Sequence, residues 1–143
     1  MTCPACRRIE SIRAGDDPLF IAELGESFCV LHKHQRYEGW CVLWLKDHHE
    51  HLALLPPSRQ LRLAEDVART SAAIHRAFNP ARINFECLGN IVPHIHWHII
   101  PRRATDPDPR STIWVRPEAE TESGVTQEQR RRLIAAIRTA AGW

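Results

Sequence analysis

The fold of this chain is decided by one stretch of its sequence, Pro93-His94-Ile95-His96-Trp97-His98-Ile99-Ile100-Pro101-Arg102. Histidines and large apolar residues alternate along it, and a proline stands near each end. On a β-strand successive side chains point to opposite faces, so His94, His96 and His98 would line one face, about 6.5 Å apart. The apolar residues between them would face a core, and their β-branched and aromatic types favour a strand. The stretch therefore predicts a half-buried strand with three imidazoles on one side.

Three interpretations of this histidine face compete. The simplest is a set of hydrogen-bonded histidines on a half-exposed sheet. A His-x-His pair can also supply two ligands of a catalytic metal ion. The third interpretation is nucleophilic catalysis by one histidine that its neighbours orient, because imidazole serves as base, acid or nucleophile near neutral pH. Three histidines in register among apolar residues favour the third interpretation.

Residues 94–100 also resemble a known family. The run His-Ile-His-Trp-His-Ile-Ile matches, at every position, the signature His-φ-His-φ-His-φ-φ of the histidine-triad (HIT) family, in which φ is an apolar residue. In that family the middle histidine attacks the α-phosphorus of a nucleotide and forms a nucleotidyl-histidine intermediate. The resemblance implies that His96 is the nucleophile and that His98 lies near the phosphate and the leaving group. It implies that His94 supports them or binds zinc.

The activity that this resemblance implies is that of a nucleotide hydrolase or nucleotidyl transferase. The expected substrates are dinucleoside polyphosphates or nucleoside phosphoramidates. Hydrolysis is the favoured hypothesis, because nothing in the sequence selects a second substrate. The alternative is a regulatory protein of the same fold that binds a nucleotide or zinc without catalysis.

A Cys-x-x-Cys motif, Cys3 to Cys6, opens the chain. A redox motif of this kind would be expected after a strand, and no strand precedes it. Two thiolates at this spacing fit half of a tetrahedral zinc site, and the alternative is a pair of free surface cysteines. In several HIT proteins such a motif is completed by a later histidine and by the first histidine of the triad. The ligands that the resemblance implies for a structural zinc ion are Cys3, Cys6, His48 and His94.

Residues that bind the substrate are expected around the triad. Gly89 and Asn90 precede it in a tight turn, where a glycine lets backbone amides approach a phosphate. Many HIT proteins carry Gly-Gln-Ser/Thr-Val here, so residues 89–92, Gly-Asn-Ile-Val, keep an amide of shorter reach and lose a hydroxyl. His32 falls where many members hold the ribose with an asparagine, and Trp40 stands where a fourth histidine is frequent. The predicted substrate-binding residues are Asn84, Gly89, Asn90, His32 and Arg102.

The remaining strands are predicted from apolar patterning between turn signals. Residues 27–31 and 40–45 form an expected hairpin, and residues 81–88 form a strand directly before the triad turn. Residues 10–26 fit a short turn and a helix or strand that leads into residues 19–24. Residues 111–115 fit a short strand or a flap near the site, where Trp114 could stack a base or serve in packing. Together with the triad strand these segments predict an antiparallel sheet of about five strands.

Helices are predicted at three places. Apolar residues recur at three- and four-residue spacing over 59–78, which indicates a long amphipathic helix. Asp47 is a candidate N-cap for a short helix over 48–55. A capping box, Thr126 to Gln129, opens a C-terminal helix that ends at about Ala141. The whole chain, residues 1–143, is therefore expected to form one α+β, HIT-like domain.

Composition argues against several classes of partner. The formal net charge is only +2 at pH 7, so no bulk attraction to nucleic acid is expected. No apolar run approaches the roughly 18 residues of a membrane span, and the first residues lack a secretory hydrophobic region, so the cytoplasm is the expected location. Five cysteines, an odd number, argue against a complete disulfide framework. A homodimer is implied by the family resemblance alone.

Overall fold

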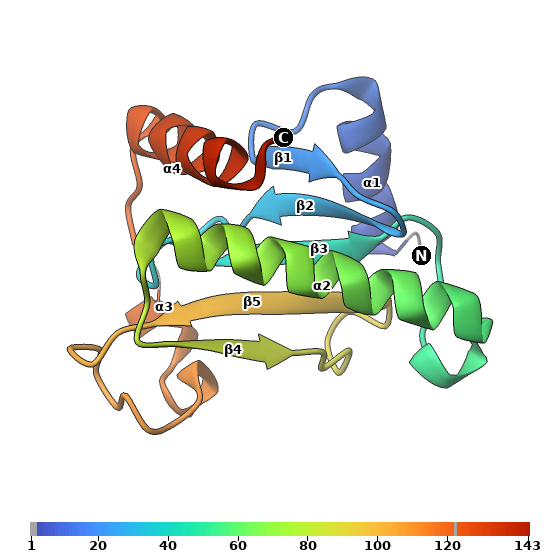
Figure 1. Cartoon of the computed structure of the whole chain (residues 1–143). Helices are drawn as coiled ribbons and strands as arrows, with labels where there is room; N and C mark the ends of the chain where they lie inside the picture. Colours follow the sequence, from blue (N-terminus) through green and yellow to red (C-terminus); the bar gives the residue numbers. More distant parts are fainter. Residues whose placement is uncertain (1–2, 122) are drawn as a thin grey trace.

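A five-stranded sheet carries the fold (Figure 1). The computed structural model describes residues 3–121 and 123–143. Its elements in chain order are α1 (Pro4–Ala14), β1 (Phe20–Glu23), β2 (Ser27–Leu31), β3 (Cys41–Leu45), the 3₁₀ helix η1 (Leu52–Leu54), α2 (Pro57–Phe78), β4 (Arg82–Glu86), β5 (His96–Arg102), the 3₁₀ helix η2 (Ile113–Val115), α3 (Glu118–Thr121) and α4 (Gln127–Ala141).

The strands lie in the order β1-β2-β3-β5-β4, and every neighbouring pair is antiparallel. This confirms the predicted α+β fold, its five strands and both major helices. The capping box before α4 is also confirmed, since Gln129 N donates to Thr126 Oγ1 and Thr126 N donates to the Gln129 side chain. Residues 19–24, which fitted a helix or a strand, supply β1, and residues 111–115 supply η2 in place of a strand.

Helices α2 and α4 cover one face of the sheet (Figure 1). The apolar side chains that meet in this layer include Leu31, Leu43 and Ile99 from the strands and Ile74 and Ile137 from the helices, all of them fully buried. Burying a side chain of this size contributes about 1.5–3 kcal/mol, so this layer supplies a large part of the apolar stabilisation. Helices α2 and α4 leave the opposite face of the sheet free for other contacts.

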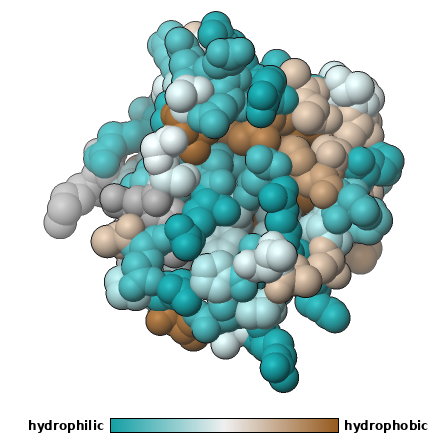
Figure 2. Space-filling view, turned by 90° about the vertical axis from the view of Figure 1, so that its left-hand side faces the viewer, coloured by the Kyte–Doolittle hydropathy of each residue, from teal (hydrophilic) through white to brown (hydrophobic). Residues whose placement is uncertain are grey.

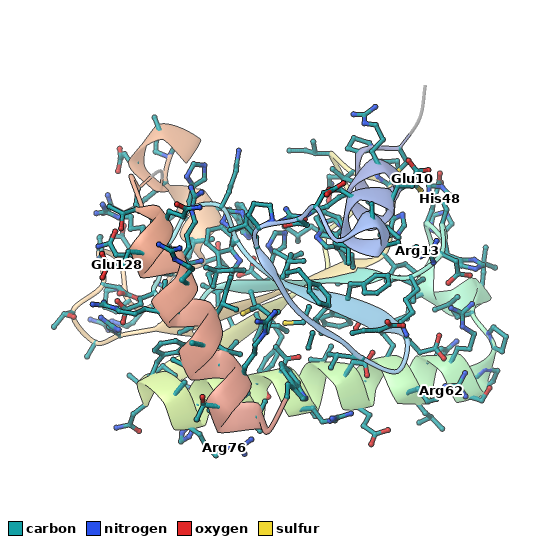
Figure 3. The ribbon with its side chains drawn as sticks, turned by 90° about the horizontal axis from the view of Figure 1, so that it is seen from above. Glu10, Arg13, His48, Arg62, Arg76 and Glu128 are labelled. Atoms are coloured by element: carbon teal, nitrogen blue, oxygen red, sulfur yellow. The ribbon has the colours of Figure 1, made fainter. Side chains whose placement is uncertain are left out.

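Helix α1 packs on that opposite face, and Figure 3 shows α1 and α2 on opposite sides of the sheet. Ile9 and Ile12 of α1 contact Phe28, Val30 and Val42 from the neighbouring strands β2 and β3. The helix therefore covers only one part of this face.

The uncovered part of the same face carries two triad histidines. Trp44 lies opposite His96 and Val42 lies opposite His98 in the β3–β5 pairing. Directly paired residues point to the same face, so both imidazoles lie on the side away from α2 and α4.

A close contact at Gly39 fixes the loop between β2 and β3. Its backbone φ is +92°, and a Cβ at this position would lie 2.6 Å from the Phe78 ring at the end of α2. Any other residue would need both an unfavourable backbone conformation and a displaced ring. This contact holds the loop that carries His32 and leads into Trp40 against the body of the protein.

Two local predictions need correction. Residues 4–14 form α1, which the sequence reading had left out: Pro4 starts the helix, and Ala5, Ile9 and Ile12 form its buried stripe. The helix expected over 48–55 is absent, and only η1 forms there. Asp47 does not cap it, because its carboxylate accepts hydrogen bonds from the side chains of Arg59 and His49.

The surface on the side where α4 begins is mostly hydrophilic, with hydrophobic patches in the upper half and at the lower edge (Figure 2). Among the described residues, no helix combines the length and apolar character needed to cross a bilayer. The expected cytoplasmic location stays a prediction.

Candidate functional site

His96 is held in the form that a nucleophile requires. Its ring is buried, and Nδ1 lies 2.6 Å from the backbone oxygen of His94. A carbonyl oxygen can only accept, so Nδ1 carries the proton and Nε2 keeps its lone pair. Trp44 stacks on the imidazole with the ring centroids 4.7 Å apart. The ring is thus fixed in both tautomer and plane.

His98 stands beside His96 on β5, with the ring centroids 5.2 Å apart. Trp40 Nε1 donates to His98 Nδ1 at 3.2 Å. Burial disfavours the charged imidazole, and a charge on His96 would disfavour it further, which together lower the pKa of His98 to about 4. His98 is therefore a neutral ring at physiological pH.

His94 has a different environment from the other two. It precedes β5, so the prediction that three histidines share one strand holds for His96 and His98 only. Its Nε2 donates to the Leu45 backbone oxygen at 2.9 Å, which leaves Nδ1 as the nitrogen with a lone pair. That Nδ1 lies 3.8 Å from the sulfur atoms of both Cys3 and Cys6. Burial, followed by the charges of neighbouring histidines, lowers the pKa of His94 and keeps it neutral.

Four side chains meet around this nitrogen: Cys3, Cys6, His48 and His94. One ligand atom from each lies within 4.8 Å of all the others, and His48 Nδ1 is 3.5 Å from the Cys6 sulfur. In a tetrahedral zinc site with bonds of about 2.0–2.3 Å, neighbouring ligand atoms lie about 3.5 Å apart. The residues therefore fit zinc, and the predicted ligands are brought together from α1, the segment after β3 and the segment before β5.

The segment that carries His48 is anchored by Arg59 of α2. The guanidinium donates to Asp47 at 3.0 Å and to the buried Glu26 at 2.7 Å. The hydrogen bonds from Arg59 lower the pKa of Asp47 to about 2, so this carboxylate stays charged in neutral solution. Figure 3 shows His48 beside α1, next to Glu10. The ion-pair network explains how an irregular segment can hold a ligand in place.

A cavity of about 590 Å³ opens over His96 and His98. Of the predicted substrate-binding residues, His32, Gly89 and Asn90 line it. Trp114, considered from the sequence as a residue that could stack a base, also lines it, as do Ile91 and Val92 of the segment before the triad; the lining residues that were not predicted are Arg8, Lys33, Val42, Trp44 and Leu88. Trp44 and Val42 could have been found from the alternation of β3, whereas Arg8 and Trp114 arrive from distant segments that no local pattern connects.

Aromatic rings form one wall of this cavity. His32 stacks on Trp40 with centroids 3.5 Å apart and an interplanar angle of 11°. Trp114 meets both Trp40 and His98 edge-on, and its indole nitrogen donates to Glu86 of β4. Burial is the main cause that lowers the pKa of His32 to about 3. The rings of His32 and Trp114, which line the cavity, thus offer it uncharged aromatic surface, which suits contact with a flat ligand.

Arg102 and Asn84 are not brought to the cavity. The Arg102 guanidinium is buried and donates to Asn84 Oδ1 at 2.9 Å, to Asp106 at 3.0 Å and to the Ser111 backbone oxygen at 2.7 Å. These bonds occupy both side chains in holding the loop after β5. The prediction that they bind substrate is corrected accordingly.

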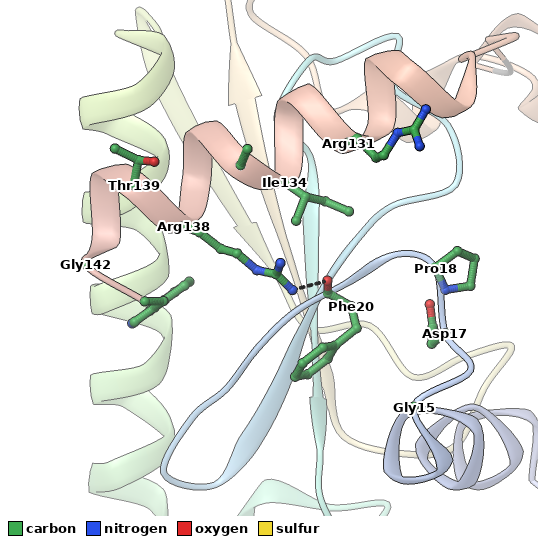
Figure 4. Close-up of a pocket in the computed structure, with 11 residues that line it drawn as sticks. Gly15, Asp17, Pro18, Phe20, Arg131, Ile134, Arg138, Thr139 and Gly142 are labelled. Carbon is green, nitrogen blue, oxygen red and sulfur yellow. Dashed lines mark hydrogen bonds between the residues drawn. The ribbon is translucent and has the colours of Figure 1, made fainter.

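A second cavity, of about 630 Å³, lies between α4 and the segment around β1 (Figure 4). Arg138 crosses it and donates to the backbone oxygens of Phe20 and Ile21. Its lining contains no histidine or cysteine, and Arg138 is engaged in holding the edge strand β1. The chemistry-bearing residues are thus concentrated in the first cavity.

Comparison with known proteins gives a consistent result. A family model described as the HIT domain matches residues 16–105. A histidine triad protein from Sinorhizobium meliloti is 26% identical with a TM-score of 0.78, and the alignment covers 90% of this chain and 93% of that chain. A histidine triad protein from Bradyrhizobium japonicum is 25% identical with a TM-score of 0.77, covering 90% and 94%.

A third structure is a zinc-bound histidine triad family protein from Mycobacterium smegmatis. It is 22% identical with a TM-score of 0.72, and the alignment covers 99% of this chain and 97% of that chain. At this identity the likeness concerns the fold. A comparison with curated proteins found no match.

Proposed function

The chain belongs to the HIT family, and from this premise we propose that it is a nucleotide hydrolase or nucleotidyl transferase in which His96 attacks an α-phosphate. The proposed substrates are dinucleoside polyphosphates or nucleoside phosphoramidates, and hydrolysis is favoured over transfer. The observation that carries the proposal is the His96 ring, whose protonated Nδ1 is bound to the His94 oxygen while Nε2 is left with a lone pair. This is the nitrogen that can form a bond to phosphorus.

The reaction would proceed in two displacements. His96 Nε2 attacks the α-phosphorus and the leaving group departs, which gives a nucleotidyl-histidine. Water or another acceptor then attacks the same phosphorus and restores the imidazole. The hydrogen bond from Nδ1 to the His94 oxygen stabilises the positive charge that the ring acquires in the intermediate.

Negative charge on the phosphate oxygens needs donors around the cavity. His98 offers a ring N–H beside the nucleophile, and the backbone near Gly89, with φ of +77°, allows close approach of amides. Arg8 and Lys33 bring positive charge to the same cavity. The base of the nucleotide would lie against the aromatic wall.

We propose that the cluster of Cys3, Cys6, His48 and His94 binds a structural zinc ion. Two thiolates and two imidazoles would fill all four positions and leave none for water, so no hydrolytic role is assigned to the metal. Its function would be to tie α1 to the segment that orients His96. The regulatory alternative, a protein that binds nucleotide or zinc without turnover, shares this cluster.

The test of the proposed function is a direct assay. Wild-type protein is incubated with a dinucleoside polyphosphate and with a nucleoside phosphoramidate, then quenched, and the peptide that contains His96 is examined by mass spectrometry. We expect turnover of at least one substrate and a nucleotidyl adduct on His96. Equilibrium binding without turnover or adduct would favour the regulatory alternative.

We also propose a homodimer formed through the sheet edge at β4 and through α2. β4 is the last strand of the sheet, Phe85 on it is 47% exposed, and Leu61 on α2 is 73% exposed. Exposed apolar groups at an unpaired edge favour association.

Light scattering should give twice the chain mass for wild type, and Phe85→Glu should shift the measured mass to that of the monomer. Arg131→Glu on α4 serves as the control, and a monomeric wild type would contradict the proposal.

A further inference from the structure

Trp40 stands at the position where a fourth histidine is frequent in the family, and it contacts the triad. Its side chain is 1% exposed and packs with Tyr37 and Ile100. Its indole Nε1 donates to His98 Nδ1 at 3.2 Å. An indole nitrogen can only donate, so His98 Nδ1 must accept with its lone pair. A neutral His98 then carries its single proton on Nε2.

The hydrogen bond is held in place from two sides. His32 stacks on the face of the indole at 3.5 Å, and Trp114 meets it edge-on. Because the indole cannot rotate freely between these rings, its N–H keeps pointing at His98. Protonating His98 at Nδ1 would set two N–H groups against each other and break this bond.

The groups around His98 act on its protonation in both directions. Burial disfavours a positive charge on His98, and a charge on His96 of the same strand would oppose it further. Arg8 and Lys33 line the same cavity and have the same sign. Glu86 lies opposite His98 in the β4–β5 pairing; one of its oxygens accepts from Trp114, and the other, Oε1, is buried without a partner among the described residues. The low pKa of His98, about 4, agrees with this arrangement.

We propose that Trp40 is a positioning residue that keeps His98 in its neutral Nε2–H form and thereby selects substrates whose leaving group departs as an anion. This inference rests on the proposed function. It separates the two proposed substrate classes, because it favours the phosphate chain of a dinucleoside polyphosphate over the amine of a phosphoramidate.

The selection follows from where the electrons go. His96 Nε2 forms its bond to the α-phosphorus, the bond to the bridging oxygen breaks, and the electron pair leaves with the phosphate chain as an anion. The proton on His96 Nδ1 stays on that nitrogen, hydrogen-bonded to the His94 oxygen, and no proton has to be transferred. His98 assists with a hydrogen bond from Nε2–H.

A phosphoramidate, in contrast, needs a proton donor for its leaving group. Cleavage of its P–N bond puts the electron pair on nitrogen, and that nitrogen must receive a proton to leave as an amine. A neutral His98 could supply the proton only by becoming an imidazolate, which is far too basic near neutral pH. An imidazolium could supply it, but the hydrogen bond from Trp40 opposes that form.

The first test is NMR spectroscopy of the His98 ring in ¹⁵N-labelled full-length protein. Wild type is expected to show unprotonated Nδ1 and protonated Nε2 from about pH 8 to about pH 5. Trp40→Phe keeps an aromatic ring but removes the N–H, and a population of neutral His98 with its proton on Nδ1 should then appear. A wild-type spectrum with the proton on Nδ1 would overturn the proposal, whether or not the variant folds.

The second test compares the two substrates. Wild type should favour the dinucleoside polyphosphate in kcat/KM by at least about 100-fold, the lower end of what a general acid contributes. In Trp40→His the new imidazole can accept as well as donate, and the preference should fall by about tenfold or more. Trp143→Phe, which removes part of an indole in the second cavity, should leave the ratio unchanged.

The outcomes are distinguishable. Equal use of both substrates by wild type, or an unchanged ratio in Trp40→His, overturns this inference and leaves the proposed function standing. No turnover of either substrate by wild type overturns the proposed function and this selectivity together. In that case the NMR result still decides the tautomer of His98.

Discussion

Replacing His96 with alanine is expected to lower kcat on the proposed nucleotide substrates by on the order of 10⁴–10⁶, as loss of a covalent nucleophile does in other enzymes. The imidazole is the group that would bond to phosphorus, and the ring of the same type beside it on β5 is His98. His98 Nδ1 is engaged by Trp40, and its Nε2 carries the proton. His98 therefore has no free lone pair with which to replace His96.

The measurement is initial-rate kinetics on purified wild type and His96→Ala, with circular dichroism to show that both are folded. His75→Ala is the matched control, because His75 is an exposed histidine on α2, on the other side of the sheet. It should retain wild-type rates. Turnover within tenfold of wild type in His96→Ala would rule out the nucleophilic role.

Removing the metal from the Cys3, Cys6, His48 and His94 cluster is expected to lower Tm by roughly 10 °C. A ligand at about 1,000 times its Kd stabilises the folded state by about 4 kcal/mol, and each kcal/mol corresponds to about 2–4 °C in a protein of this size. Turnover should fall before the protein unfolds, because His94 takes part in both the metal cluster and the orientation of His96. The His94 ring belongs to the cluster, while the His94 backbone oxygen accepts the hydrogen bond from His96 Nδ1.

The experiment pairs metal analysis with thermal melts before and after chelation. One equivalent of zinc is expected in wild type and little in Cys6→Ser. Cys87→Ser is the control, since Cys87 is exposed and lies outside the cluster. Wild type that contains no metal and melts at the same temperature with and without chelator would contradict the zinc proposal.

The sequence predicted the parts of this structure that local patterns determine. Strict alternation gave the strand with His96 and His98, and the apolar period over 59–78 gave α2 close to its observed bounds, Pro57–Phe78. The family resemblance placed Cys3, Cys6 and His48 together with His94, and the structure brings these four residues together.

Other features depend on contacts that no local pattern reveals. The sequence predicted Asp47 as an N-cap, but its carboxylate accepts a hydrogen bond from the Arg59 guanidinium instead. The backbone of the same segment also makes a tertiary hydrogen bond, in which Ile95 N donates to the His49 oxygen. A helix over 48–55 would lose both interactions, so tertiary structure overrides the local signal.

Arg102 shows that a residue close to the triad in sequence need not lie close to it in space. It follows the triad closely in the chain, yet four residues of strand carry it about 13 Å beyond His98. At that end of β5 it meets Asn84 and the following loop rather than the cavity. The residues that do reach the cavity, such as Arg8 and Trp114, come from segments remote in sequence.

The wide spacing of the proposed zinc ligands has a consequence for how the protein is made. Cys3 and His94 are 91 positions apart, so a ribosome that adds about 5–20 residues per second needs roughly 5–20 s to synthesise the chain between them. Throughout that interval the two thiols have no complete site to enter. If the cluster binds zinc as proposed, Cys3 and Cys6 therefore stay open to oxidation until His94 has been synthesised.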